Sequence, residues 1–202
     1  MARLRSPAAG RNLEPITGIL QGHLRGEGAV LEVGSGPGEH IVAWAAAFPN
    51  LTWIPSDVSL AARESIAHYR ASALTANVRP PEAVDLADRS WGLRWAGELA
   101  AIVAVNVLHI APWEVSLGLL HGAGHGLVAG GQLFIYGPFM RNGAHTSESN
   151  DRFDRSLREQ DARGGVRDAA DRERVAFAEG LDLAESHAMP ANNRILRFVA
   201  RA

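Results

Sequence analysis

"AVLEVGSGPGEH", residues Ala29 to His40, is an apolar run that passes directly into three glycines spaced two apart. A glycine-rich turn between a strand and a helix lets a ligand approach the backbone without meeting a Cβ, and amide donors at the helix start point toward that ligand. Acidic side chains flank the glycines, Glu32 before them and Glu39 after them. The stretch therefore predicts a first strand, a ligand-binding turn and a first helix.

Strand-like and helix-like segments alternate beyond this turn. The predicted elements are strands at 29–34, 51–57, 78–85, 99–110 and 132–137, and helices at 39–48, 60–73 and 112–128. Pro80 and Pro81 lack the amide donor of a sheet ladder, so the strand at 78–85 is expected at an edge. The alternation is typical of a parallel sheet with helices on both faces, which binds ligands at the carboxyl ends of its strands.

The C-terminal part of the chain has a different pattern. Residues 150–161 and 168–180 are predicted to be helices, and residues 183–189 and 194–201 are predicted to be strands. Only the four residues 190–193 join these two strands, which is too short for a parallel crossover. We therefore expect a mostly parallel, seven-stranded α/β sheet that ends in an antiparallel hairpin, within one domain of 202 residues.

The composition narrows the possible chemistry. Hydrophobic residues make up 47% and charged residues 21% of the chain, with a formal net charge of -2, so neither nucleic acid nor a membrane is the expected partner. Cysteine is absent and all 20 basic residues are arginine, which excludes thiol nucleophiles, lysine Schiff bases and a P-loop lysine. The first residues show no secretory signal, so a cytoplasmic location is expected.

The residues around the glycine turn indicate the kind of ligand. Asp57 ends the second predicted strand about 20 residues after Gly36, the spacing of a carboxylate that binds ribose hydroxyls. Glu39 occupies the last small-residue position of the dinucleotide pattern G-x-G-x-x-G/A, which disfavours a pyrophosphate. The carboxylate of Glu32 likewise disfavours a phosphate in the turn and favours a ligand that carries a positive charge and an amine.

The pattern E-x-G-x-G-x-G, the ribose carboxylate, the strand end Val84-Asp85-Leu86 and the closing hairpin resemble the class I S-adenosylmethionine-dependent methyltransferases. More narrowly, the whole chain resembles the DUF938 group, which includes the methyltransferase-like 26 proteins. The stretches that carry this resemblance are Arg11-Asn12, LEVGSGPGEH, LTWIPSD, NVLHIAPW, GGQLFIYGPF, GVRD and MPANN. Two residues depart from the group, since Pro37 stands where threonine is usual and Leu13 where lysine is usual.

The resemblance implies a Rossmann-like fold and S-adenosylmethionine as the cofactor. Gly34 and Gly36 would lie against this cofactor while Glu32 braces the turn. Asp57 would bind the ribose, and Asp85 with the amide of Leu86 would face the adenine edge.

The resemblance also assigns residues around the methionine part of the cofactor. Asn106 would border the methionine amine and the transferable methyl group. Arg11 would pair with the methionine carboxylate and Asn12 would lie beside it, both in a helical lid formed by residues 1–28.

Catalytic residues must lie at the strand ends near Asn106, and the candidates are His109 and Tyr136. If His109 accepts a proton, activity should rise with pH through the ordinary histidine range. His121 and His125 lie one helical turn apart but have no obvious third ligand, so no metal site is predicted.

Three functions stay open at this point. The first is a methyltransferase of a small, unidentified molecule, and the second is a protein that binds S-adenosylmethionine without catalysis. The third is an NAD-dependent oxidoreductase, which the strand, the glycine turn and Asp57 favour and Glu39 disfavours. The sequence does not indicate an oligomeric state.

Overall fold

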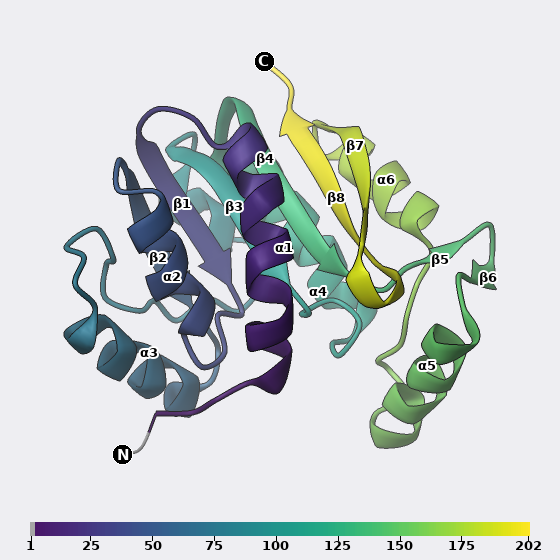
Figure 1. Cartoon of the computed structure of the whole chain (residues 1–202). Helices are drawn as coiled ribbons and strands as arrows, with labels where there is room; N and C mark the ends of the chain where they lie inside the picture. Colours follow the sequence, from purple (N-terminus) through teal and green to yellow (C-terminus); the bar gives the residue numbers. More distant parts are fainter. Residues whose placement is uncertain (1–2) are drawn as a thin grey trace.

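A six-stranded sheet runs through the computed structural model, which describes residues 3–202, in the order β2-β1-β3-β4-β8-β7 (Figure 1). Its strands are β1 (Gly28–Val33), β2 (Leu51–Ser56), β3 (Leu99–Val105), β4 (Leu127–Gly137), β7 (Leu181–Met189) and β8 (Asn193–Ala200). Neighbours among β1 to β4 pair in parallel, whereas β8 pairs antiparallel with both β4 and β7. The mostly parallel α/β architecture with a C-terminal antiparallel hairpin is therefore confirmed.

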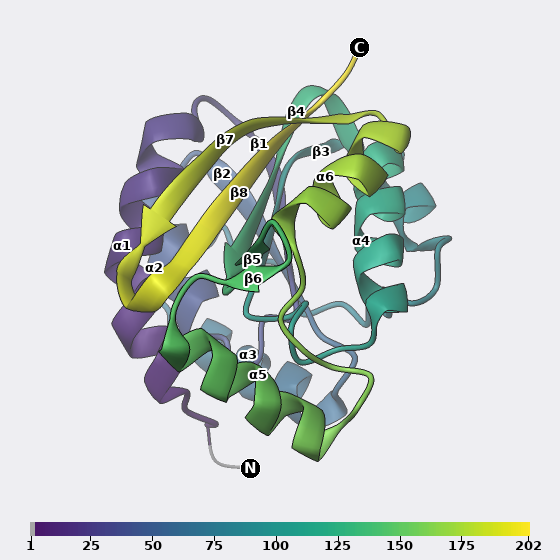
Figure 2. The same ribbon diagram turned by 90° about the vertical axis from the view of Figure 1, so that its right-hand side faces the viewer.

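Helices cover both faces of the sheet (Figure 2). They are α1 (Pro7–His23), α2 (Glu39–Ala47), α3 (Leu60–Ser72), α4 (Trp113–Gly126), α5 (Glu148–Gln160) and α6 (Ala169–Ala178), with the short 3-10 turns η1 (Trp91–Trp95) and η2 (Pro190–Asn192). Buried side chains of α1, α2 and α3 form one apolar cluster with the sheet, and those of η1, α4 and α6 form the other. A small hairpin of β5 (Met140–Arg141) and β6 (Ala144–His145) precedes α5.

The register brings the carboxyl ends of the parallel strands to one edge. Val33 at the end of β1 is level with Ser56 at the end of β2, and Val105 of β3 is level with Tyr136 of β4. The segments that follow these strands therefore meet at this edge, which is where an open α/β sheet binds its ligands. The β5–β6 hairpin and α5 lie toward the same edge (Figure 1).

The seventh strand predicted at 78–85 is not formed, so the predicted number of strands is wrong. This segment runs along β2 through only two isolated parallel bridges, Trp53↔Val78 and Ser56↔Glu82. Pro80 and Pro81 between the bridges have no amide hydrogen to donate to a ladder. The segment does lie at the edge of the sheet, beside β2, as predicted. The two prolines that favour this edge position also prevent a continuous strand.

The buried strand predicted to reach residue 110 ends at Val105. The next residue, Asn106, has a left-handed backbone with φ 58°, which ends the extended conformation. Residues 107–110 then form a turn in which the Ile110 amide donates to the Val107 carbonyl at 3.3 Å. His109 is therefore positioned by a turn and not by strand alternation.

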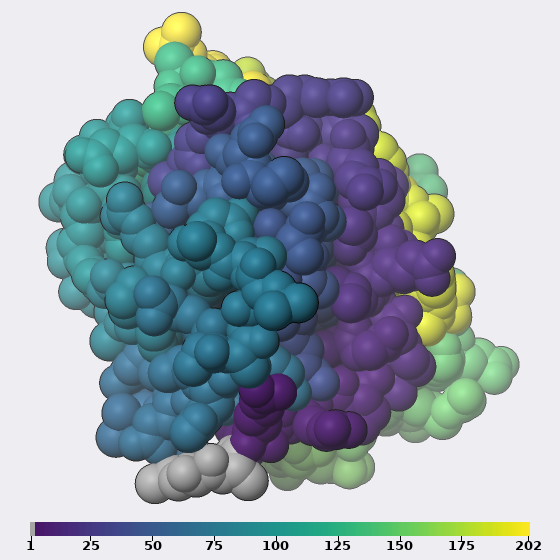
Figure 3. Space-filling model, turned by 60° about the vertical axis from the view of Figure 1, so that its left-hand side comes forward, coloured from purple at the N-terminus to yellow at the C-terminus, as the bar shows by residue number. Residues whose placement is uncertain are grey.

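Helix α1 is a packed part of the domain. Its residues Ile16 and Leu20 are fully buried against the sheet, and Ser6 caps its first turn. In Figure 3 the purple N-terminal segment lies against the blue α2–α3 region, where the Leu4 amide donates to Ser65 Oγ at 2.9 Å. Over residues 3–202, no helix combines the length and apolar character needed to cross a bilayer.

Candidate functional site

The glycine turn follows β1 with a left-handed backbone at Gly34, Gly36 and Gly38, whose φ angles are 63°, 53° and 98°. A Cβ on Gly34 would lie 2.6 Å from Val107 Cγ2, so the packing of this chain already requires glycine there. A Cβ on Gly36 would meet no atom within 4 Å. The turn is therefore open at Gly36, where a side chain would enter free space.

Asp57 links this turn to the end of β2. Its Oδ2 accepts a hydrogen bond from the Gly36 amide at 3.0 Å, and its Oδ1 accepts one from the Ser59 amide at 2.9 Å. The Asp57 amide donates to the Glu82 carbonyl at 3.1 Å. The carboxylate thus lies beside the open glycine, with both oxygens already ordered by backbone donors.

Glu32 is 1% exposed, beneath the glycine turn. Burial raises the pKa of its carboxyl group to about 8, and the nearby Asp57 contributes in the same direction. Its Oε2 is buried without a hydrogen-bond partner among the described residues. A buried polar oxygen without a partner costs free energy, so this oxygen is available to a ligand group that can bond it.

His40, in the first turn of α2, connects Glu32 to α1. Its Nε2 lies 2.7 Å from Asn12 Oδ1, its Nδ1 lies 3.7 Å from Glu32 Oε1, and its ring stacks on Trp44. Burial lowers the pKa of His40 to about 4. Because 3.7 Å exceeds a hydrogen bond and both groups are buried, we regard His40 and Glu32 as a neutral pair at pH 7.

Tyr136, near the end of β4, links Asn12 of α1 to Asn193 of the C-terminal hairpin, and these three residues are called the Tyr136 group. The Tyr136 hydroxyl accepts a hydrogen bond from Asn193 Nδ2 at 3.0 Å. Burial raises the pKa of Tyr136, while hydrogen bonds with Asn193 and Asn12 and the charge of Arg11 act against that rise. The side chains of α1, β1, α2, β4 and β8 thus meet at the carboxyl edge of the sheet.

His109 and Asn106 lie next to the end of β4. The Asn106 amide donates to the Tyr136 carbonyl at 3.0 Å, and a Cβ on Gly137 would lie 3.1 Å from His109 Nδ1. His109 is 5% exposed and its ring packs edge-on against Phe153 of α5. Burial, followed by the positive charges of Arg172 and Arg167, lowers the pKa of His109 to about 4.

Asp85 and Leu86 come shortly after Glu82, which forms a bridge with Ser56 of β2 and accepts a hydrogen bond from the Asp57 amide. Asp85 is exposed, and its Oδ1 accepts a hydrogen bond from the Ala87 amide at 2.9 Å. Leu86 is 5% exposed, and its carbonyl oxygen packs tightly against Gly118 of α4. The segment therefore lies on the β2 side of the carboxyl edge, away from the Tyr136 group.

His40 was not predicted to belong to this site. It ends the quoted stretch, and its signal was a polar side chain directly after the glycine turn. Asn193 lies in the link between the last two strands, where asparagine suits a tight turn and can also reach the site from the hairpin. A surface groove of about 710 Å³ between α1 and α2 is lined by residues such as Leu13, Thr17 and Ala43 and does not include the site.

The raised pKa of Glu32 predicts a pH dependence of stability. Its folded-state pKa of about 8 exceeds the ordinary value of 4.5, so its stabilising effect is complete below pH 4.5 and is lost as pH rises through 8. Between pH 6.5 and 7.5 Glu32 by itself should lower the free energy of unfolding by about 1 kcal/mol. His40 and His109 partly offset this decline, because their pKa is lowered in the folded protein and the unfolded chain releases their protons in this range.

Urea unfolding at several pH values measures this dependence. Glu32→Gln should lack the decline, because glutamine has no proton to lose. Equal pH slopes for the parent and for Glu32→Gln would contradict the assignment.

Several solved structures with a similar fold carry methyltransferase names. The S-adenosylmethionine-dependent methyltransferase SibL in its apo form superposes with a TM-score of 0.77 at 20% identity, over 96% of this chain and 56% of SibL. An O-methyltransferase family protein from Burkholderia thailandensis has a TM-score of 0.79 at 19% identity, over 96% of this chain and 57% of that protein.

A third structure is similar over more of its own length. The magnesium protoporphyrin IX methyltransferase (ChlM) from Synechocystis PCC 6803 with bound SAH has a TM-score of 0.69 at 18% identity, over 95% of this chain and 83% of that protein. The chain spans little more than half of SibL and the Burkholderia protein. At these identities the similarity shows the Rossmann-like class I methyltransferase fold.

The family profile described as protein of unknown function (DUF938) matches residues 3–200. This match covers nearly the entire chain, including the glycine turn, Asp57, the Tyr136 group and the C-terminal hairpin. The chain therefore belongs to the DUF938 family.

Proposed function

We propose that this protein is an S-adenosylmethionine-dependent methyltransferase that acts on a small molecule. The observation that carries the proposal is the open left-handed turn at Gly36, held by Asp57 and lying above the buried, unpartnered oxygen of Glu32. This combination suits a ligand that has a ribose and an amine but no phosphate. The cofactor would supply a methyl group on a sulfonium sulfur, which a nucleophile can displace directly.

The residues of the site fit this cofactor part by part. Gly36 leaves room for it, and Asp57 has further acceptor capacity on the oxygens that already bind Gly36 and Ser59, so it can accept from ribose hydroxyls. Glu32 has an unpartnered oxygen for the methionine amine, directly or through water. We assign Asp85 and the Leu86 amide to the adenine edge, on the β2 side where Asp57 lies.

The methionine end of the cofactor would lie toward β3 and β4. Asn106 ends β3 in a left-handed conformation beside Tyr136. Arg11 is exposed on α1, one residue from buried Asn12, and its charge acts on Tyr136. We therefore keep Arg11 for the methionine carboxylate, with Asn12 orienting His40. We regard residues 3–28 as a cover of the site; residues 1 and 2 of the predicted lid lie outside the described residues.

A nicotinamide dinucleotide suits the same turn less well. The Glu39 carboxylate, in the first turn of α2, accepts a hydrogen bond from the Ser6 amide at 2.8 Å. A negative side chain at this helix start would oppose a pyrophosphate, which such a helix otherwise attracts. The structural features therefore favour S-adenosylmethionine over NAD.

A protein that binds S-adenosylmethionine without catalysis is the remaining alternative. Incubation of the protein with methyl-labelled S-adenosylmethionine and a deproteinised metabolite extract separates the two functions. We expect label to appear in a small molecule, and to be lost with the Gly36→Val variant. Label that stays entirely on tightly bound cofactor would support the non-catalytic alternative.

We propose that His109 accepts the proton of the methyl acceptor, with Tyr136 lining the same space. Since the pKa of His109 is lowered to about 4, its imidazole is neutral from about pH 5 upward. The activity should therefore be level between pH 6 and 8 and decline only in more acidic solution. This expectation differs from a rise through the ordinary histidine range, because burial lowers the pKa of His109.

His109→Gln should lower kcat for an acceptor found in the extract by about 10²-fold, because general-base catalysis contributes this much. Affinity for the cofactor should stay unchanged, since Asp57 and Gly36 are intact. Phe153→Leu, which alters only the ring that packs on His109, serves as the control and should change kcat by a few fold at most. A kcat of His109→Gln within a few fold of the parent would exclude His109 as the base.

A further inference from the structure

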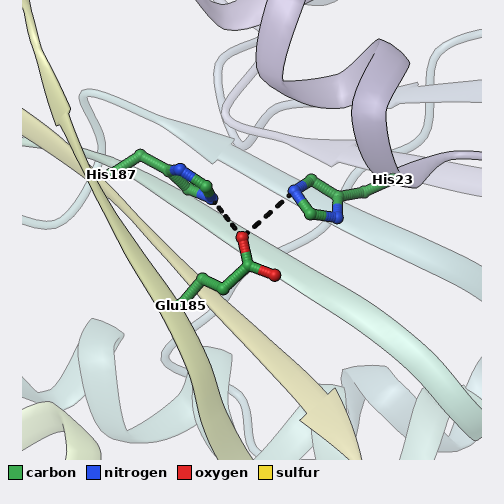
Figure 4. A group of neighbouring side chains, drawn as sticks. All are labelled: His23, Glu185 and His187. Atoms are coloured by element: carbon green, nitrogen blue, oxygen red, sulfur yellow. Dashed lines mark ion pairs between the residues drawn. The ribbon is translucent and has the colours of Figure 1, made fainter.

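A second group of polar side chains lies away from the glycine turn, between α1 and the outer strand β7 (Figure 4). His23, the last residue of α1, has its Nε2 3.3 Å from Glu185 Oε2, and His187 Nε2 lies 2.7 Å from the same oxygen. One ligand atom from each residue lies within 4.8 Å of the others. Two imidazoles therefore converge on one carboxylate oxygen.

A β-bulge in β7 brings Glu185 and His187 to this face of the sheet. Leu183 pairs with Phe198, but Glu185 pairs with Arg197, so Ala184 is an extra residue in the ladder. Leu183 packs on the α4–α6 side, whereas Met189 packs on the α1–α2 side. Without the extra residue, Glu185 and His187 would share the face of Leu183 and could not meet His23.

The contact between His187 and Glu185 is not an ordinary hydrogen bond. His187 Nε2 is buried and has no hydrogen-bond partner among the described residues, although it lies 2.7 Å from Glu185 Oε2. The two atoms are thus close together without the angle that a shared proton requires. Nitrogen and oxygen atoms that lie this close without sharing a proton are arranged as ligands of a common metal ion would be.

The surroundings favour an oriented carboxylate. Arg197 Nη2 donates to Glu185 Oε1 at 2.7 Å and leaves Oε2 to face the two rings. Carboxylates that bind metals are commonly held by such a second hydrogen bond.

We propose that His23, Glu185 and His187 form a binding site for a divalent transition-metal ion of the Zn²⁺ type. Two imidazole nitrogens and one carboxylate oxygen are ligands that Zn²⁺ prefers over Mg²⁺ or Ca²⁺. Ligands about 2.0–2.1 Å from a tetrahedral Zn²⁺ are about 3.3 Å apart, which agrees with the 3.3 Å between His23 Nε2 and Glu185 Oε2.

Three protein ligands leave the fourth position of the metal to water. The ion would fasten the C-terminal end of α1 to the edge strand β7. The positive charge of Arg197 lowers the affinity, so a weaker site than a fully acidic one is expected. Sequence spacing could not reveal this site, because His23 lies far along the chain from the other two ligands.

Equilibrium dialysis of the untagged protein against ZnCl₂ at pH 7.5, with the bound metal counted by mass spectrometry, tests the proposal. We expect one Zn²⁺ per chain and a higher melting temperature with Zn²⁺. His23→Gln and His187→Gln should each weaken binding by more than about tenfold, since even the loss of a supporting residue costs about that much. Co²⁺ should give the visible absorption of a four-coordinate nitrogen and oxygen site.

The double variant His121→Gln/His125→Gln is the matched control. His121 Nδ1 lies 2.9 Å from Glu179 Oε2 and its ring lies 4.5 Å from that of His125, but His125 Nδ1 bonds the His121 carbonyl instead of joining a shared centre. This variant should bind Zn²⁺ like the parent. Absence of Zn²⁺ binding by the parent, or loss of binding only in the double variant, would overturn the proposal.

Discussion

Replacement of Gly36 by valine is expected to abolish measurable binding of S-adenosylmethionine, with an affinity at least about a hundredfold lower, or ~2.7 kcal/mol. The structure leaves open space where the Cβ of residue 36 would lie, and the proposed cofactor occupies that space. The protein should remain folded, because a Cβ at this position meets no atom of the chain within 4 Å. Calorimetric titration and circular dichroism measure the two effects.

Gly97→Val is the matched control for this variant. Gly97 also has a left-handed backbone, with φ 66°, and a Cβ there would likewise meet no atom within 4 Å. Each substitution should cost at least about 1–2 kcal/mol of stability, because side chains disfavour this backbone region. Only Gly36→Val should lose binding, and equal affinities of the two variants would remove the glycine turn from the cofactor site.

Asp57→Ala is expected to lower the affinity for S-adenosylmethionine by about 10- to 100-fold, since charge-assisted hydrogen bonds to two ribose hydroxyls contribute ~1.5 to 3 kcal/mol. The structure adds a second consequence. Asp57 also holds the amides of Gly36 and Ser59, so the variant should lose some stability even without the ligand. Calorimetry and thermal melting separate the two contributions.

Asp168→Ala is the control for the structural contribution. Asp168 accepts hydrogen bonds from the Gly143 amide at 2.6 Å and from the Ala170 amide at 3.0 Å, an arrangement like that of Asp57. It should lose similar stability and keep its affinity for the cofactor.

A cofactor analogue without the ribose 2′-hydroxyl provides an independent check. The parent should bind it more weakly than the natural cofactor, and Asp57→Ala should not distinguish the two. If the variant retains the preference of the parent, the ribose lies elsewhere.

The architecture could be predicted because its signals are local. The glycines after β1, the near-continuous apolar run of β3 and the four-residue link before β8 each restrict the backbone strongly. The errors occurred where two local preferences compete. Pro80 and Pro81 kept an edge segment from becoming a strand, and left-handed Asn106 ended β3 before residue 110.

The site was less predictable because its contacts are between distant segments. Asn12 and His40 meet only through the packing of α1 on α2, and Asn193 reaches Tyr136 only through the pairing of β8 with β4. The lowered pKa of His109 likewise arises from burial under α5 and from Arg172, 63 residues further along the chain. None of these effects leaves a periodic pattern in the sequence.

Calorimetric titration of the parent with S-adenosylmethionine, S-adenosylhomocysteine and NAD tests the central claim most directly. We predict that both sulfur-containing ligands bind at one site per chain, that Gly36→Val binds neither, and that NAD gives no heat of binding. Binding of NAD alone, or binding of S-adenosylmethionine that is unaffected by Gly36→Val, would contradict the assignment of this turn to the methyl-donor cofactor.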